Sequence, residues 1–238
     1  MKRKTVKKLF YFIIFTLLAF TAGSFLYTRL TPGMDTKEAD YYYDLLSRHE
    51  KPAPGMIFDL EIKTGDTLEE SFKKLMKIYG FKGTGIILSR TNNEKPPAMI
   101  IDHGYGALEI QLSKKVAERR EQINVLIHEL CHIYVWHLDK SVFGKCDEEK
   151  LTDTMGVYIG LGVFILNGLT DEAFFMPGGE YGTEKKFFGY LKPEEFGYLV
   201  ARFARDHNIP EAKVMQHLNP TGRKYFSFGL AHLKRSGR

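Results

Sequence analysis

The stretch "VLIHELCHIYVWHLD", residues 125–139, holds His128, Glu129 and His132 in the order HExxH within an apolar run. On an α-helix, residues four apart lie on the same side, so both imidazoles can reach one ion while Glu129 projects beside them. Two histidines on an apolar helix are more often packed core residues. Glu129 would then be a charge moved toward the core without a partner, which is costly. The stretch therefore predicts a metal site on a helix.

Two acidic residues on the next predicted helix offer the further ligand that such a site needs. The segment "EKLTD" places Glu149 and Asp153 four residues apart, and Glu149 stands 17 residues after His132, which leaves room for a turn and an antiparallel return. Three protein ligands and an open fourth position are typical of catalytic zinc, whose bound water has a pKa of about 7. By spacing, either Glu149 or Asp153 can be the third ligand. Glu148 is a poorer candidate because Thr152, four residues on, is not acidic.

The residues after HExxH exclude one class of zinc peptidase. A metzincin has a glycine three residues past its second histidine and another histidine three residues later. Here Val135 and Leu138 occupy those positions. His137 points to a different face of the helix, so the third ligand is expected from a later element.

Taken together, HExxH and the later ExxxD resemble the gluzincins, the thermolysin-like class of zinc peptidases. The resemblance implies one zinc ion held by His128, His132 and Glu149, with Asp153 holding His128 in the right tautomer. The sequence departs from that class in having Glu148 where an asparagine usually precedes the ligand glutamate, and in being far smaller.

The resemblance also implies a reaction, the hydrolysis of peptide bonds by a zinc-activated water. Glu129 would act as the general base and return the proton to the leaving amine. Residues 105–205 are similar to a group of uncharacterised bacterial HExxH proteins, which says nothing about substrate. Spacing does not reveal the oxyanion-stabilising group, and the downstream donors that could serve, each more often an ordinary packing or surface residue, are Tyr181, Tyr190, Tyr198, His217 and Arg223.

An uncharged stretch near the N-terminus predicts a single membrane span. Residues 9–27, "LFYFIIFTLLAFTAGSFLY", are just long enough to cross a hydrocarbon core. Five cations precede them and only Arg29 and Lys37 follow nearby, so the N-terminus is expected in the cytoplasm and the remaining chain outside it. A signal peptide cleaved near residues 22–24, giving a secreted protein, is the alternative. We favour an anchor because residues 25–27 continue the apolar run.

Charge and cysteine content exclude other classes of protein. The formal net charge is +5, but the five cations among residues 2–8 supply it, which leaves residues 9–238 about neutral. A nucleic-acid-binding face is therefore not expected. Cys131 and Cys146 are too few for a disulfide framework, although export would permit one bridge.

The order of predicted elements is strands first and helices after, an α+β arrangement. Residues 1–30 are expected to form a basic tail and membrane anchor, residues 31–55 a stalk, and residues 56–238 a small zincin-like domain. In that domain, N-terminal strands would pack on an active-site helix pair, followed by a helical C-terminal part. Alternation and β-branched content predict strands at 56–62, 84–90, 97–102 and 106–112.

Helical patterns account for most of the remaining chain. Thr67 and Glu70 form a predicted capping box at the start of the first helix. Gly156, Gly160 and Gly162 indicate close backbone packing of the second active-site helix against a neighbour. Helices of the domain are predicted at 67–81, 117–138, 148–166, 193–206, 210–218 and 221–235.

The strand predicted at 106–112 lies just before the HExxH helix and has two interpretations. It could be an exposed edge that pairs with an extended peptide substrate. It could equally be a plain strand inside the sheet. The sequence does not decide between them.

Two functions of different classes fit these features. One is a membrane-anchored zinc metallopeptidase that acts on a peptide or protein outside the cytoplasm. The other is a catalytically silent, zinc-binding interaction module of the cell envelope. Glu129 favours the enzyme, because a purely structural zinc site is usually closed by four protein ligands. A third interpretation, a regulatory protease facing the cytoplasm, is opposed by the charge asymmetry around residues 9–27.

Overall fold

The computed structural model describes residues 34–237 apart from residues 64, 82–84, 94–95, 176–180 and 187–188, and leaves the side chains of residues 170–188 undescribed. The predicted membrane segment, residues 9–27, lies outside the described residues. The chain divides into two units, Met1–Asp35 and Thr36–Arg238, and the elements below all belong to the second.

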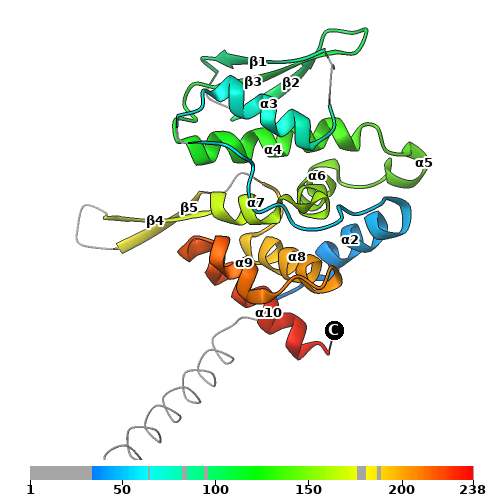
Figure 1. Ribbon diagram of the computed structural model, residues 1–238, viewed down its shortest axis with the longest axis vertical. Coiled ribbons are helices and arrows are strands. Elements are labelled where there is room, and N and C mark those ends of the chain that lie inside the picture. Colours follow the sequence, from blue (N-terminus) through cyan, green and yellow to red (C-terminus); the bar gives the residue numbers. More distant parts are fainter. Residues whose placement is uncertain are drawn as a thin grey trace, which may run out of the picture. The chain divides into compact units, whose positions relative to one another are not determined.

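A small mixed sheet and two helices make up one layer of this unit (Figure 1). The strand order is β1-β3-β2, with β1 (Gly85–Thr91) parallel and β2 (Ala98–Asp102) antiparallel to β3 (Ala107–Ser113). Ile110 and Leu112 of β3 are fully buried. The helices α3 (Leu68–Ile78) and α4 (Arg119–Val135) lie on one side of the sheet, and α4 contacts β2 and β3.

Three of the four predicted strands are confirmed, and so is the capping box of α3, in which the Glu70 backbone N–H donates to Thr67 Oγ1 (3.2 Å). The strand predicted at 106–112 is β3, the middle strand, so its interpretation as an exposed edge is wrong. Its backbone groups are already occupied by β1 on one side and β2 on the other. Among the described strands, β2 forms the free edge that leads toward α4.

The helix predicted at 148–166 forms, but it is kinked near Gly160. It consists of α6 (Glu148–Gly156), a π-helical turn η1 (Val157–Leu161) and α7 (Gly162–Gly168). Gly160 has φ of +89°, which favours glycine, and a Cβ there would come within 2.6 Å of the Gly55 carbonyl oxygen. The Ile57 backbone N–H donates to the Gly160 carbonyl (2.8 Å). The glycine therefore allows an earlier segment of the chain to dock on the break.

This docking explains why the strand predicted at 56–62 does not form. Met56 and Leu60 bury their side chains as the alternating pattern suggests. The backbone of Ile57 pairs with the helix break, however, and the segment joins neither sheet. An alternating apolar pattern marks a half-buried extended segment, and the partner that buries it need not be a strand.

Among the described residues, one helical stretch is long and apolar enough to cross a membrane, namely Glu148–Gly168. Of its most apolar window, 83% is buried inside the structure. It packs against α4, α2 and α8. Its apolar character is that of a core helix.

Residues 31–55 are predicted as a stalk, but the structure places the part from Thr36 onward in the body of the domain. Helix α2 (Lys37–His49) buries Tyr42, Tyr43, Leu45 and Leu46. The Arg202 guanidinium donates to Asp40 Oδ1 (2.6 Å) and also bonds to Asp44. The buried face of α2 packs against α6 and α8.

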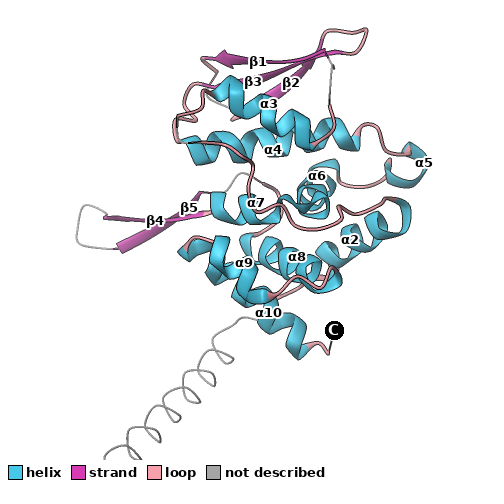
Figure 2. Ribbon diagram, in the orientation of Figure 1, coloured by secondary structure: helices cyan, strands magenta, loops and turns pink. Residues whose placement is uncertain are grey.

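The helices at the C-terminus are confirmed close to their predicted bounds as α8 (Pro193–Asp206), α9 (Glu211–His217) and α10 (Pro220–Arg235). Helices α8 and α10 approach closely at Gly197, where a Cβ would come within 2.1 Å of the Tyr225 carbonyl oxygen. The hairpin of β4 (Thr170–Phe175) and β5 (Tyr181–Lys186) and the short α5 (Lys140–Phe143) complete the unit. Figure 2 shows helices forming most of it, so the α+β prediction is confirmed.

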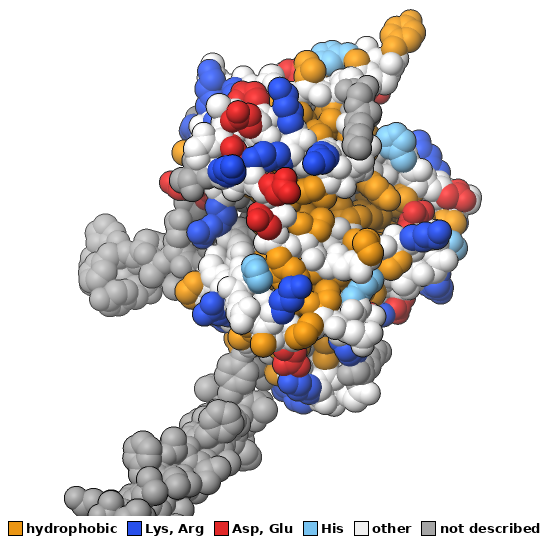
Figure 3. All heavy atoms as spheres, viewed as in Figure 1, with side chains coloured by type: hydrophobic (Ala, Val, Ile, Leu, Met, Phe, Trp, Pro, Cys, Tyr) orange, Lys and Arg blue, Asp and Glu red, His pale blue; other side chains and the backbone are white. Residues whose placement is uncertain are grey.

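Charged side chains of both signs lie on the surface of the domain. On the face drawn in Figure 3, cationic and anionic side chains are interspersed, and apolar side chains form a band between them. Cys131 is buried, Cys146 is partly exposed, and both are free thiols.

Candidate metal centre

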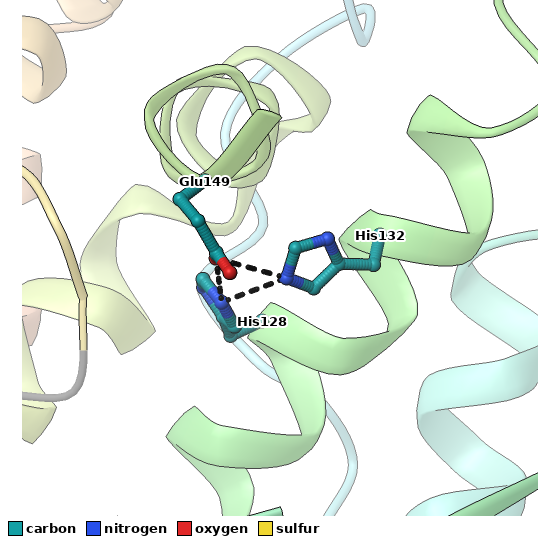
Figure 4. A group of neighbouring side chains, drawn as sticks. All are labelled: His128, His132 and Glu149. Atoms are coloured by element: carbon teal, nitrogen blue, oxygen red, sulfur yellow. Dashed lines mark hydrogen bonds and ion pairs between the residues drawn. The ribbon is translucent and has the colours of Figure 1, made fainter. Parts of the chain in front are cut away.

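The side chains of the HExxH motif meet an acidic side chain from the neighbouring helix. His128 and His132 project from successive turns of α4, and Glu149 projects toward them from the first turn of α6 (Figure 4). His128 Nε2 lies 3.2 Å from Glu149 Oε2, His132 Nε2 lies 3.1 Å from the same oxygen, and the two ring nitrogens are 3.1 Å apart. The three atoms form a nearly equilateral triangle.

This triangle fits a zinc ion. Zinc bonds of 2.0–2.1 Å in a tetrahedron keep ligand atoms about 3.3–3.4 Å apart. Two imidazoles and one carboxylate are a usual donor set for catalytic zinc. Among the described residues, His128, His132 and Glu149 form the one group of potential ligands gathered closely enough to hold a metal ion.

Asp153 lies behind His128, on the side away from the triangle. Its Oδ1 accepts a hydrogen bond from His128 Nδ1 (3.0 Å). Its Oδ2 accepts from the backbone N–H groups of Tyr190 (2.5 Å) and Leu191 (2.9 Å). The carboxylate is buried and both of its oxygens accept hydrogen bonds. It therefore fixes the ring of His128 and leaves Nε2 directed at the triangle.

His132 is held in a corresponding way by a different set of groups. Its Nδ1 lies 3.2 Å from Glu148 Oε1 and 3.2 Å from Thr152 Oγ1. The indole N–H of Trp136 donates to the same Glu148 oxygen (2.6 Å). Glu148, the poorer ligand candidate by sequence, therefore orients a histidine and lies outside the triangle.

Burial and mutual contacts shift the pKa values of the three residues of the triangle. Burial opposes a charge on His128, but hydrogen bonds to Asp153 and Glu149 outweigh it and raise the pKa of His128 to about 10. The hydrogen bond from His128 lowers the pKa of Glu149 although burial opposes it. Burial, with the charge on His128, lowers the pKa of His132. One proton on His128 thus occupies the position that a cation would take between these groups.

Glu129 lies beside the triangle without belonging to it. Its side chain is buried yet lines the cleft that opens over the histidines. Burial, helped by the negative charge of Glu149 and opposed by His128, raises the pKa of Glu129 to about 7. A carboxylate with this affinity for protons is suited to exchange them near neutral pH.

The start of α6 is positioned by α2, the helix that lies within the predicted stalk. The Asp147 side chain caps α6 by accepting from the backbone N–H groups of Glu149 (3.1 Å) and Lys150 (3.3 Å). The Asp147 backbone N–H donates in turn to the Tyr42 hydroxyl of α2 (3.3 Å). Lys150 pairs with Glu38 of α2 at 2.6 Å. Helix α2 therefore helps to set the position from which Glu149 reaches the triangle.

A cleft of about 500 Å³ opens over His128, His132 and Glu149. Its lining includes Ala98, Met99 and Ile100 of the free strand edge β2, together with Tyr190. The Tyr190 ring stacks beside that of His128, with centroids 6.1 Å apart. Burial raises the pKa of Tyr190, and so does a hydrogen bond between its hydroxyl and Glu149. The phenol therefore lies in the cleft next to the triangle.

The other predicted oxyanion donors lie elsewhere. Tyr198 is buried on α8 and its hydroxyl donates to Asp40. His217 packs on Phe58, with ring centroids 4.5 Å apart. Arg223 donates to the Met215 carbonyl (2.9 Å). The side chain of Tyr181 lies outside the described residues.

Two features of the site were not recognised from sequence. Trp136 and Glu148 were not assigned to the cleft, although Trp136 follows His132 by one helical turn and its ring therefore belongs to the same face. The role of β2 as the strand edge beside the site depends on strand order, for which the sequence held no signal.

One comparison with known proteins bears on this geometry. Residues 68–147 match the SprT-like family, a zinc metallopeptidase-like domain with an HExxH motif. The match covers about a third of the chain, from α3 through the sheet and α4 to α5, and it ends just before Glu149. No curated protein and no solved structure matches the chain. The part that holds HExxH is thus similar to a zinc metallopeptidase-like domain, while Glu149 and Asp153 lie beyond the matched residues.

Proposed function

We propose that this protein is a zinc-dependent metallopeptidase. The observation that carries the proposal is the convergence of His128, His132 and Glu149 on one point, with Glu129 beside them in an open cleft. The similarity of residues 68–147 to a zinc metallopeptidase-like family supports it. The free edge of β2 supports a peptide substrate, because an extended chain can add to an unpaired strand edge in the cleft.

In this proposal His128, His132 and Glu149 hold one zinc ion. Zinc in such a site supplies a water of lowered pKa and a positive charge that polarises a carbonyl. The Glu129 carboxylate accepts the proton of the attacking water and passes it to the leaving nitrogen. The Tyr190 hydroxyl donates a hydrogen bond to the oxygen that becomes negative in the transition state. Asp153 keeps both His128 and the backbone of Tyr190 in place for these steps.

The assignment of ligands is tested by zinc content. His128→Ala, His132→Ala and Glu149→Ala should each lose stoichiometric zinc, because each removes one of three donors. Asp153→Asn should weaken zinc binding by about 10- to 100-fold, the usual effect of losing a partner of a ligand. His137→Ala is the matched control, since this histidine lies in the turn after α4 and contacts the Ile133 carbonyl (2.6 Å). If Asp153→Asn empties the site and Glu149→Ala leaves it full, the two roles are reversed.

The role of Glu129 separates an enzyme from a silent binding module. Glu129→Gln keeps the size of the side chain but cannot accept a proton. Zinc content and thermal stability should therefore stay at the wild-type level while peptide hydrolysis falls by about 100- to 10,000-fold. A comparison of envelope peptides from cells that express either form detects cleavage even while the specificity is unknown. The peptidase proposal would be contradicted if wild-type and Glu129→Gln strains gave identical envelope peptides and phenotypes, while a strain lacking the whole gene had a different phenotype.

Tyr190 is tested in the same assay once a substrate is known. Removing one donor to a developing oxyanion lowers kcat by about 100- to 1,000-fold. Tyr190→Phe should show such a fall in kcat with little change in KM and with zinc retained. Tyr105→Phe, which removes a hydroxyl from a fully exposed tyrosine outside the cleft, is the control. A KM effect alone would limit Tyr190 to substrate binding.

The proposed enzyme acts at the membrane, with its site outside the cytoplasm. This part of the proposal is supported by residues 9–27, which are uncharged and follow five cations. A reporter enzyme that is active only after export, fused after Arg238, should be active in cells that carry the full chain. Activity of a cytoplasm-dependent reporter at the same position would overturn the orientation. Fractionation of the cells would show whether the protein stays with the membrane or is released.

A further inference from the structure

An aromatic and an acidic side chain line the cleft beside His132. Trp136 lies one helical turn after His132, with the two ring centroids 6.4 Å apart, and its side chain remains 42% exposed. Glu148 reaches the same place from α6, and its side chain is 52% exposed. The hydrogen bond from the indole N–H to Glu148 Oε1 joins the aromatic ring and the carboxylate into one wall of the cleft.

The described lining of the cleft is rich in carboxylates. Among the described residues that line it there are three glutamates and no lysine or arginine. Glu149 belongs to the metal-binding triangle, and Glu129 is buried beside it. Glu148 is the exposed member of the three. Both of its contacts, to His132 and to Trp136, involve Oε1, which leaves Oε2 available to a bound molecule.

An aromatic face that ends in a carboxylate matches one kind of side chain. Lysine and arginine combine an apolar stem, which packs on an aromatic ring, with a cationic head. The head gains from the ring as well as from the carboxylate. A purely apolar side chain would cover Glu148 without pairing it, and an acidic one would be repelled. Pro96, Pro97 and Met99, which line the same cleft, add apolar surface for the stem.

We propose that Trp136 and Glu148 form a specificity subsite that selects peptides with a lysine or arginine next to the scissile bond. The proposal rests on the proposed peptidase function and names its substrate class. The same composition disfavours recognition of a C-terminal carboxylate, since the described lining holds no lysine or arginine to pair with it. Cleavage within a chain, beside a basic residue, is the expected activity.

The test uses the zinc-loaded, full-length protein and a randomised decapeptide library, with cut sites read by mass spectrometry. Lysine and arginine should be enriched at one position flanking the cut. Matched peptides that carry lysine or norleucine at that position then isolate the charge, because the two side chains share an aliphatic stem. The ratio of their kcat/KM values should favour lysine in the wild type.

Glu148→Gln is the decisive variant, because its amide oxygen can still accept from Trp136 and His132 while the charge is lost. The lysine-to-norleucine ratio should fall about fivefold, the modest effect expected of a half-exposed pair. Glu69→Gln removes an equivalent charge from an exposed position outside the cleft and should leave the ratio unchanged. Trp136→Ala should lower kcat/KM for both peptides about fivefold, since the stem loses its surface. Zinc content is measured for every variant.

Binding of the same two peptides to zinc-loaded Glu129→Gln protein gives a readout that does not depend on turnover. Cleavage without a basic preference, or with a preference that Glu148→Gln leaves intact, overturns the subsite while the peptidase stands. Absence of cleavage together with tighter binding of the lysine peptide, lost in the Glu129→Gln/Glu148→Gln double variant, overturns the peptidase while the subsite stands. Equal binding of both peptides and no cleavage overturns both.

Discussion

The site depends most on the buried carboxylate of Asp153. An ionised carboxylate in a protein interior is tolerated only when hydrogen bonds replace its water. Here one oxygen accepts from His128 and the other from two successive backbone N–H groups, those of Tyr190 and Leu191. Three parts of the chain that are distant in sequence are thereby fixed to one another: the HExxH helix, the acidic helix α6, and the segment that enters α8.

The buried position of Asp153 restricts how α6 can pack. The helix must be buried enough to carry Asp153 into the core, yet its first turn must reach the cleft with Glu148 and Glu149. The structure meets both demands by extending α6 through the break at Gly160 into α7, so that the apolar part lies inside the domain. The segment around Ile57 covers the break, and α2 holds the first turn through Tyr42 and Asp147. The residues that orient Glu149 thus begin at α2, more than a hundred positions before it.

Sequence patterns predict relations between residues that are close in the chain. They do not predict which distant segments pack together. His128 and His132, or Thr67 and Glu70, are fixed by helical spacing, and the structure places both pairs as expected. Whether strand 106–112 is an edge depends on what pairs with it, and no local pattern contains that information. The interpretation of residues 37–49 as part of a stalk is wrong for the same reason. Their apolar positions indicate that one face is covered, but Tyr42 and Leu46 do not specify that α6 and α8 cover it.

The similarity of residues 68–147 to the SprT-like family covers the sheet and the HExxH helix, which bring two imidazoles and Glu129 to the cleft. Two imidazoles alone leave a divalent cation with weak and poorly directed binding, because a catalytic zinc site uses three protein donors. The proposed third donor is Glu149, two residues beyond the matched segment, and its neighbour Glu148 supplies the charge beside Trp136. Helix α6 therefore contributes both to the proposed metal site and to the proposed selection of substrate, and a change in its packing against α2 would alter the two together.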